Sequence, residues 1–255
     1  MKIVAIIQAR MSSTRLPEKV LADIGGRPML YRVVERVRLT PAIAEVIVAT
    51  STDASDEPIA LYCKKQGFSC FRGDLSDVLA RYYHAARAYR ADVIVRITAD
   101  CPLHDPAVIQ KVVRAFDPQK HDYVSNVLPP TYPDGLDTEV FSFATLERMH
   151  TEAVLPSERE HVTFYITNHP ECFRIHNVPY TEDLHTYRWV VDRPQDLVFA
   201  QAVYSHFGEK SFGMEDILAL LREQPELCKL NEGIQRNEGH AAALQADHEY
   251  RSHSN

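Results

Sequence analysis

The sequence predicts an α/β protein in which a mainly parallel sheet is covered by helices on both faces. Short β-branched runs alternate with longer amphipathic segments over residues 3–116, and this alternation is typical of strand–helix–strand units. The runs are almost entirely apolar, as expected for strands that are buried on both sides. No repeat of fixed period interrupts the order. These observations predict a Rossmann-like three-layer sandwich.

The first half of the chain supplies most of the expected sheet. Residues 3–7, Ile-Val-Ala-Ile-Ile, are too few for a helix and rich in β-branched side chains, so they predict a buried strand. Gly25, Gly26 and Pro28 predict a turn that leads into a helix at 29–39. The same two patterns predict strands at 45–50, 68–72 and 92–97, and helices at 56–66, 77–90 and 106–116.

The regular alternation breaks near His121, and turn-forming residues are dense at 128–135. We therefore expect a main domain at 1–230 that carries a small lobe at 128–185. Residues 231–255 are polar and predict a tail with a short helix. The elements expected after the break are strands at 122–126, 137–141, 173–175 and 186–191, and helices at 143–151, around 162–166, at 194–206, at 216–221 and at 241–244.

Composition excludes several classes of protein. The chain has 255 residues and a net charge of −7, which argues against a general nucleic-acid binder because such proteins present a basic face. No stretch approaches the roughly 18 apolar residues of a membrane span, and no leader segment is apparent. The five cysteines are odd in number and form no CxxC pair. They predict free thiols in a reducing cytoplasm, and zinc is not expected.

A cationic loop follows the first strand. Arg10, Arg15 and Lys19 are interleaved with the hydroxyls of Ser12, Ser13 and Thr14. Loops at the carboxyl ends of buried strands are where open α/β sheets bind ligands. Hydroxyls, backbone N–H groups and fixed positive charges together suit a polyphosphate. Because the chain is acidic overall, this placement of cations is informative.

The loop also carries a resemblance. Residues 10–17, Arg-Met-Ser-Ser-Thr-Arg-Leu-Pro, followed by Lys19, resemble the nucleotide-binding signature of sugar nucleotidyltransferases. The match is to the cytidylyltransferase branch, which includes CMP-KDO synthetases, acylneuraminate cytidylyltransferases and SpsF-like proteins. Residues 237–239, Asn-Glu-Gly, also resemble the SpsF-like proteins. The resemblance implies a GT-A-like nucleotidyltransferase sandwich. A Walker A or GxGxxG loop is excluded here, because the chain has no glycine before Gly25.

Two aspartates are candidates for a metal site. Asp100 ends the strand at 92–97, where it could meet a magnesium-bound phosphate or cap the next helix, although Asp105 before Pro106 is the better cap. The resemblance implies that Asp100 is a metal ligand. Asp192 lies in a segment similar to the Val-Asp-x-Pro-x-Asp-Leu of CMP-KDO synthetases, which implies that it completes a Mg²⁺ site and that Asp196 opens a helix.

Residues 71–81 resemble the segment that closes over the nucleotide base. This similarity makes Asp74 and Arg81 candidates for nucleotide binding. Asp74 or Asp77 could equally cap the following helix, and Arg81 could face either way.

The acceptor side is expected around residues 134–140, which resemble the acceptor-side strand of SpsF-like proteins. Asp137 and Glu139 alternate on one face and offer acceptors for sugar hydroxyls, or they are solvated strand residues. Cations for an acceptor carboxylate could come from Arg159, Arg174 and Arg188.

The resemblance implies a magnesium-dependent enzyme that joins CMP from CTP to a sugar and releases pyrophosphate. Arg10, Lys19, Asp100 and Asp192 are the predicted catalytic residues, and the nucleotide-binding set adds Ser12, Ser13 and Arg15 to Arg10 and Lys19. An ulosonic acid is the expected acceptor, because two carboxylates on magnesium suit activation of an anomeric hydroxyl.

Two other functions stay open on sequence alone. One is a glycosyltransferase. Such enzymes usually carry an Asp-x-Asp motif, but the corresponding segment here, Asp100-Cys101-Pro102, has only the first Asp. The other is a non-catalytic nucleotide-binding protein, against which the intact Asp100, Asp192 and Lys19 argue. A homodimer is expected through the lobe, whose aromatic residues are predicted to be exposed: Tyr132, Phe143, Tyr165, Phe173 and Tyr180.

Overall fold

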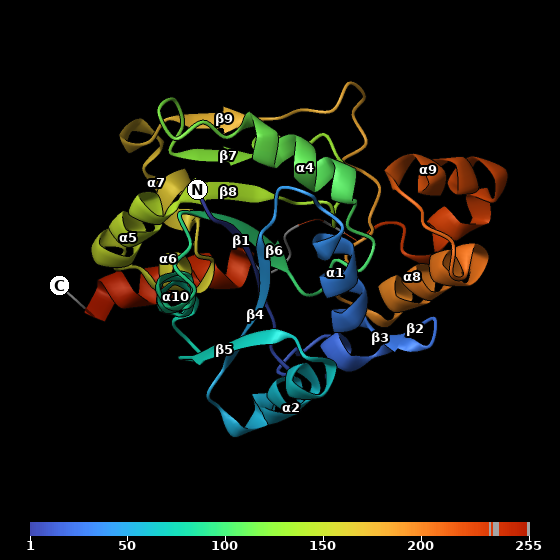
Figure 1. The fold of residues 1–255 in the computed structure, drawn as a ribbon, viewed down its shortest axis with the longest axis horizontal. Coiled ribbons are helices and arrows are strands. Elements are labelled where there is room, and N and C mark those ends of the chain that lie inside the picture. Colours follow the sequence, from blue (N-terminus) through green and yellow to red (C-terminus); the bar gives the residue numbers. More distant parts are fainter. Residues whose placement is uncertain (235, 237–239, 254–255) are drawn as a thin grey trace.

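The computed structural model describes residues 1–234, 236 and 240–253. A twisted sheet runs through the centre of the molecule, with helices on either side of it (Figure 1). Its seven strands lie in the order β5-β4-β1-β6-β8-β7-β9. They are β1 (Ile3–Gln8), β4 (Glu45–Ser51), β5 (Ser69–Gly73), β6 (Val93–Thr98), β7 (Tyr123–Ser125), β8 (Glu139–Ser142) and β9 (Ile175–Asn177).

The sheet is mixed because one of these strands is reversed. β1, β4, β5 and β6 run parallel, whereas β8 pairs antiparallel with both β6 and β7. β1 is central, since it pairs with β4 on one side and β6 on the other. The chain therefore leaves β1 toward one edge of the sheet and later returns to its other side at β6. Such a switch point opens a crevice at the carboxyl ends of the strands.

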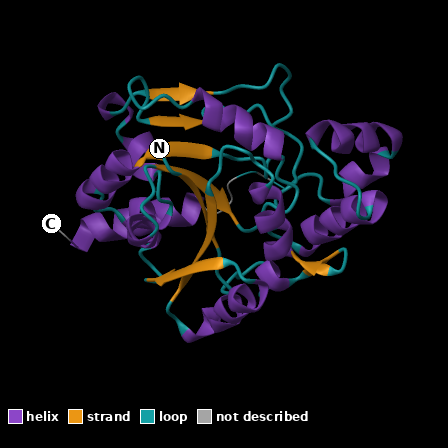
Figure 2. Cartoon of the chain, in the orientation of Figure 1, coloured by secondary structure: helices purple, strands orange, loops and turns teal. Residues whose placement is uncertain are grey.

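Two separate hydrophobic cores make the molecule a three-layer sandwich, as the sequence predicts. Alternate residues of β1 face opposite cores: Ala5 and Ile7 face one, and Val4 and Ile6 face the other. The helices of the first core are α1 (Met29–Arg38), α2 (Glu57–Gln66), α4 (Pro106–Ala115), α8 (Pro194–Phe207) and α9 (Met214–Glu223). Those of the second are α3 (Val78–Ala88), α5 (Phe143–Glu152) and α7 (Phe164–Asn168) (Figure 2).

Most predicted elements are confirmed within one or two residues, and their ends follow the expected chemistry. Asp105 caps α4 by accepting a 2.6 Å hydrogen bond from the Ala107 N–H. Gly67 ends α2 in the left-handed conformation at φ 66°. The predicted turn at Gly25 and Gly26 joins a small hairpin of β2 (Asp23–Ile24) and β3 (Arg27–Pro28).

The strand predicted at 186–191 is wrong, although this segment is mostly buried and partly extended. Its backbone bonds with loops, because Trp189 N–H donates to the Asp134 carbonyl at 2.7 Å and Val191 N–H donates to the Asp100 carbonyl at 2.8 Å. Gly135, at φ 106°, permits this approach, since a Cβ there would lie 2.6 Å from the Val190 nitrogen. The segment thus ties two loops of the cavity together.

Residues 128–185, predicted as a lobe, contribute β8 and β9 to the main sheet. Their division from the rest of the domain stays a prediction. The range also holds α5, α6 (Pro156–Glu160) and α7. The helix predicted around 162–166 is two short helices, α6 and α7, with Val162 between them at φ 55°.

The C-terminal region is more ordered than a polar tail. Short 3-10 segments include η4 (Pro225–Leu230), and the chain ends in α10 (His240–His253), which packs on α6 (Figure 1). The Asn-Glu-Gly at 237–239 lies outside the described residues. Within the described part of the chain, no helix has both the length and the apolar content needed to cross a lipid bilayer.

Candidate active site

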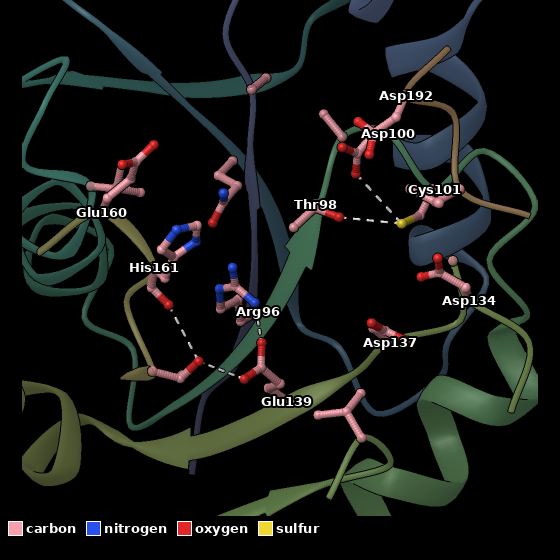
Figure 3. A pocket seen from close by; sticks show the side chains of 18 of the residues that line it. Arg96, Thr98, Asp100, Cys101, Asp134, Asp137, Glu139, Glu160, His161 and Asp192 are labelled. Atoms are coloured by element: carbon pink, nitrogen blue, oxygen red, sulfur yellow. Dashed lines mark hydrogen bonds and ion pairs between the residues drawn. The ribbon is translucent and has the colours of Figure 1, made fainter. Parts of the chain in front are cut away.

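A cavity of about 600 Å³ opens at the carboxyl ends of β1 and β6. The cationic loop lines it with Arg10, Ser12, Ser13, Arg15 and Lys19, and Asp100 and Asp192 line it in contact with that loop. Farther along the same cavity, Asp134 and Asp137 face inward, with Arg96 and Glu139 beyond them (Figure 3). The cavity thus joins the predicted phosphate end to the predicted acceptor end.

The cationic loop is held in place by a buried carboxylate from the next strand–helix unit. Asp56 is fully buried, and its Oδ1 accepts a 2.7 Å hydrogen bond from the Met11 N–H. Its other oxygen accepts a 2.6 Å bond from the Ser51 hydroxyl. Glu18 completes the turn in the left-handed conformation, at φ 60°, directly before Lys19. These contacts fix the backbone of the loop, while the side chains of Arg10 and Arg15 stay partly exposed to the cavity.

Lys19 joins the two aspartates that the sequence places far apart. Its Nζ donates to Asp100 Oδ2 at 2.8 Å, to Asp192 Oδ1 at 2.6 Å and to the Val191 carbonyl at 3.0 Å. All three donor positions of the ammonium are thus used. The predicted meeting of Asp100 and Asp192 at one place is present in the structure, and Figure 3 shows the two side by side.

The electrostatics of this cluster favour the charged forms of Lys19 and Asp100. Burial by itself would lower the pKa of Lys19, but the neighbouring carboxylates of Asp100 and Asp192 outweigh burial and raise it. Burial would likewise raise the pKa of Asp100, yet the Lys19 ammonium and the Thr98 hydroxyl lower it to about 2. Lys19 and Asp100 therefore form an ion pair at neutral pH.

Asp192 is oriented from a second side by arginines and by the start of α8. Its Oδ2 lies 2.9 Å from Arg15 Nη2 and 3.7 Å from Arg188 Nη2. Asp196 accepts hydrogen bonds from the backbone N–H groups of Asp192 and Arg193 at 3.0 and 2.9 Å, and it is paired with Arg188. Asp196 therefore lies at the helix start, as expected, and fixes the backbone that carries Asp192.

The two carboxylates fit a Mg²⁺ ion that also takes oxygens from its substrate. Asp100 and Asp192 are hard oxygen donors close enough to share one ammonium, and their side chains are 24% and 20% exposed. Among the described residues, no group of three or more His, Cys, Asp or Glu side chains is arranged to hold a metal. The donor set therefore suits a cation with one or two carboxylate ligands and several substrate oxygens.

Glu139 and Arg96 form a closed ion pair at the far end of the cavity (Figure 3). Glu139 Oε1 also accepts 2.6 Å hydrogen bonds from the hydroxyls of Tyr123 and Thr163. Each carboxylate oxygen of Glu139 is thus engaged with the protein. This geometry gives Glu139 a role in shaping the cavity wall, and its prediction as a sugar contact has no direct support.

Asp137 and Asp134 form an acidic pair that faces Arg236. Asp137 Oδ1 lies 2.5 Å from Arg236 Nη2, and Asp134 Oδ1 lies 3.8 Å from Arg236 Nε. Burial and the nearby Asp137 carboxylate raise the pKa of Asp134 to about 7, against the opposing effect of Arg236 and Arg188. Burial also raises the pKa of Asp137. At the acceptor end, the ionised forms of Asp134 and Asp137 are therefore less favourable than those of exposed carboxylates.

Of the two residues predicted to bind the nucleotide near its base, Arg81 lines the cavity and Asp74 does not. Asp74 is exposed and does not line the cavity. Its Oδ1 accepts hydrogen bonds from Ser76 and Asp77 within the loop before α3. Arg81 does line the cavity, but it is only 2% exposed and donates to the carbonyls of Asp74 and Leu75 at 3.0 Å. Arg81 thus holds the loop, and the geometry supports no nucleotide contact by Asp74.

The comparisons with known proteins agree with this geometry. The family model described as cytidylyltransferase matches residues 4–227, which is most of the chain. The chain belongs to the cytidylyltransferase family. The spore coat polysaccharide biosynthesis protein SpsF of Bacillus subtilis is 33% identical over 88% of this chain and 95% of its own length. An uncharacterized protein of Methanocaldococcus jannaschii is 35% identical over 92% of this chain and 97% of its own.

Solved structures extend the comparison. A cytidylyltransferase from Leptospira borgpetersenii superposes with a TM-score of 0.87 at 32% identity, covering 92% of this chain and 100% of that one. A CMP:2-keto-3-deoxy-manno-octonic acid synthetase complexed with CTP shares the fold, with a TM-score of 0.61 at 20% identity over 81% of this chain and 99% of its own. The protein is therefore a nucleotidyltransferase of the CTP-using kind.

Some residues that line this cytidylyltransferase cavity, and Asp56 behind its cationic loop, are absent from the sequence-based prediction. Arg96 has a recognisable signal, since it is the lone cation in an apolar strand. Asp56 and Asp134 have weaker signals, because both lie in polar loops that also suit turns. Arg236 has none, because it lies among the polar residues after 230.

Proposed function

We propose that this cytidylyltransferase transfers CMP from CTP to an eight- or nine-carbon 2-keto acid sugar and releases pyrophosphate. The observation that carries the proposal is the contact of Lys19, a residue of the cationic loop, with both Asp100 and Asp192 in the cavity. A triphosphate placed along that loop brings its α-phosphorus toward the two carboxylates. The remainder of the cavity, past Asp134 and Asp137, is then the space for the sugar.

The loop residues bind and neutralise the triphosphate. Arg10 and Arg15 offer charge-assisted hydrogen bonds to phosphate oxygens, and the hydroxyls of Ser12 and Ser13 add neutral ones. Arg15 also contacts Asp192, so it couples the leaving pyrophosphate to the reacting centre. Positioning and charge stabilisation, rather than a covalent intermediate, supply catalysis in such a transfer.

Asp100 and Asp192 would hold Mg²⁺ at the reacting centre. When bound, this ion lowers the pKa of the acceptor hydroxyl and stabilises charge that develops on phosphorus oxygens. Lys19 favours the ionised form of Asp100 and holds the two carboxylates adjacent before substrate arrives. The acceptor oxygen then attacks the α-phosphorus in line, and pyrophosphate leaves toward Arg10 and Arg15.

The choice of a sugar acid is supported by relatives. Several 3-deoxy-manno-octulosonate cytidylyltransferases match just under half of this chain, and that of Trichlorobacter lovleyi is 38% identical over 46% of this chain and 45% of its own length. SpsF is named for polysaccharide biosynthesis, and we propose a surface glycan as the destination of the product. All five cysteines are free thiols, which supports a reducing cytoplasmic location.

A homodimer is also part of this proposal, but its original basis in exposed aromatic residues is wrong. Tyr132 and Phe173 are buried, and Phe143, Tyr165 and Tyr180 are half-buried. The proposal therefore depends on the resemblance to cytidylyltransferases that dimerise through such a region, and on the frequency of two-fold dimers. Light scattering over a range of concentrations tests it, and a constant mass near 29 kDa would contradict it.

The central experiment measures pyrophosphate release from CTP and Mg²⁺ with three acceptor arms: KDO, neuraminic-type acids and hexose 1-phosphates. We expect turnover with one or more of the 2-keto acids. Turnover confined to the hexose phosphates would refute the carboxylate acceptor while leaving the nucleotidyltransferase intact. ATP, GTP and UTP in place of CTP provide the control for the base.

A further inference from the structure

Arg236 enters the acceptor end of the cavity from the C-terminal region. Its side chain is 16% exposed and lines the cavity together with Asp134 and Asp137. Nη2 is bonded to Asp137 at 2.5 Å and Nε faces Asp134, but the buried Nη1 has no hydrogen-bond partner among the described residues. An unpaired donor on a buried cation is costly, so a ligand oxygen at this point would be favoured.

Other cations near the acceptor end are engaged more completely by the protein. The Arg96 guanidinium is paired with Glu139, which Tyr123 and Thr163 hold in turn, although its Nε also lacks a partner within the described chain. Arg188 is paired with the fully buried Asp196. Arg159 is paired with Asp77 and Arg174 with Asp122, and neither arginine lines the cavity.

The position of Arg236 is fixed on both sides by packed structure. Before it, the Asn231 side-chain amide donates to the Arg188 carbonyl at 2.9 Å and to Asp196 at 3.0 Å. After it, Asp247 of α10 accepts buried hydrogen bonds from the Ser157 N–H and hydroxyl of α6, at 2.9 and 2.6 Å. Within the cavity the guanidinium itself is held by its contacts with Asp137 and Asp134.

The geometry points to Arg236 as the residue that binds the anionic group of the acceptor, with Asp137 as the positioning residue that orients it. This inference rests on the proposed function. An anion entering between Asp134 and Asp137 meets two carboxylates, and Arg236 is the cation placed to offset their repulsion. The forked guanidinium bonds Asp137 with one nitrogen and leaves Nη1 for an acceptor oxygen. A sugar-acid carboxylate and a sugar phosphate both present such an oxygen.

The test compares Arg236→Ala and Arg236→Lys with the wild-type enzyme at saturating CTP. We expect Arg236→Ala to raise KM for the acceptor ten- to hundredfold, to change kcat less, and to leave Kd for CTP within about twofold. Arg236→Lys keeps the charge but loses the fork, so we expect an intermediate KM. Arg251→Ala is the matched control, because Arg251 is an exposed arginine of α10 that does not line the cavity.

A neutral amide analogue of the acid acceptor separates anion binding from a structural effect. We expect Arg236→Ala to penalise the acid and leave the amide nearly unchanged, and the hexose 1-phosphate arm shows whether the anion is a phosphate instead. Equal losses for acid and amide, an unchanged KM for the acid, or a parallel loss of CTP binding would each overturn the inference while the proposed function stands. A wild-type enzyme that turns over no acceptor overturns both.

Discussion

The Nζ of Lys19 lies 2.6 Å from Oδ1 of Asp192, a residue 173 positions farther along the chain. This contact joins the loop after the first strand to the start of α8. Because Lys19 also contacts Asp100, three distant parts of the sequence meet at one ammonium.

Replacing Lys19 with Met removes the cation and leaves two adjacent carboxylates. Breaking a buried ion pair costs roughly 3–5 kcal/mol. We expect the free energy of unfolding to fall by about 3 kcal/mol, the lower end of this range, because both aspartates are partly exposed to solvent. Chemical denaturation at pH 7 measures this loss. The loss should shrink as pH falls from about 4 toward about 2, because the lowered pKa of Asp100 stabilises the native state only where its carboxylate is ionised. A loss independent of pH would contradict the electrostatic explanation.

Arg10→Ala should weaken CTP binding ten- to hundredfold, as loss of a charge-assisted contact costs roughly 1.5–3 kcal/mol. The Arg10 side chain is 51% exposed and contacts only Glu160 at 3.6 Å among the ion pairs of the described chain, so the fold should survive. Titration calorimetry measures Kd. Arg87→Ala, an exposed arginine of α3 outside the cavity, is the control. Equal Kd values for the two variants would mean that the loop is a solvated turn.

Asp100→Asn and Asp192→Asn each remove one charge with little change of shape. We expect kcat to fall by on the order of 10²–10³ and not to recover at high Mg²⁺, because in the proposed mechanism each variant loses a ligand of the metal. Thermal melting should show that both variants stay folded. Asp216→Asn, at the start of α9, is a matched control that keeps activity. Rates near wild type in both site variants would remove the two-carboxylate centre from the mechanism.

His104 predicts a pH dependence of stability. It is fully buried, its Nε2 lies 3.0 Å from the Thr138 hydroxyl, and its Nδ1 lies 3.2 Å from the Gly135 carbonyl. Burial lowers the pKa of His104 to about 4, so the unfolded state binds the proton first as pH falls. The contribution of His104 to the free energy of unfolding is therefore fully present above pH 6.5. It falls by about 3 kcal/mol in total as the pH is lowered to 4.

The comparison with His104→Gln isolates this contribution. Urea unfolding of both proteins between pH 7 and pH 4 should give a flatter pH dependence for the variant, although the variant is less stable at pH 7. Parallel curves for the two proteins would show that His104 does not titrate in this way.

The sequence predicts the sandwich well because its strands and helices carry strong local patterns. The run at 3–7 and the helix at 29–39 need little tertiary information. The segment at 186–191 has a strand-like composition, yet its hydrogen bonds go to loops at Asp134 and Asp100, and composition does not encode the partner.

The site divides in the same way. Lys19, Asp100 and Asp192 lie in motifs, so their positions could be found by resemblance. The position of Arg236 could not be found in this way. It depends on contacts that Asn231 and Asp247 make with Arg188 and Ser157, which are distant in the sequence. Tertiary contacts alone bring it to Asp137.

The spread of the triad along the sequence has a consequence for synthesis of the chain. A ribosome that has made the first 150 residues has produced the cationic loop and Asp100, but Lys19 then lacks its partner Asp192, which lies just before α8. The nascent protein therefore acquires a complete nucleotide pocket only after Asp192 has emerged and docked. We therefore expect fragments that end before Asp192 to bind CTP more weakly than the full chain does.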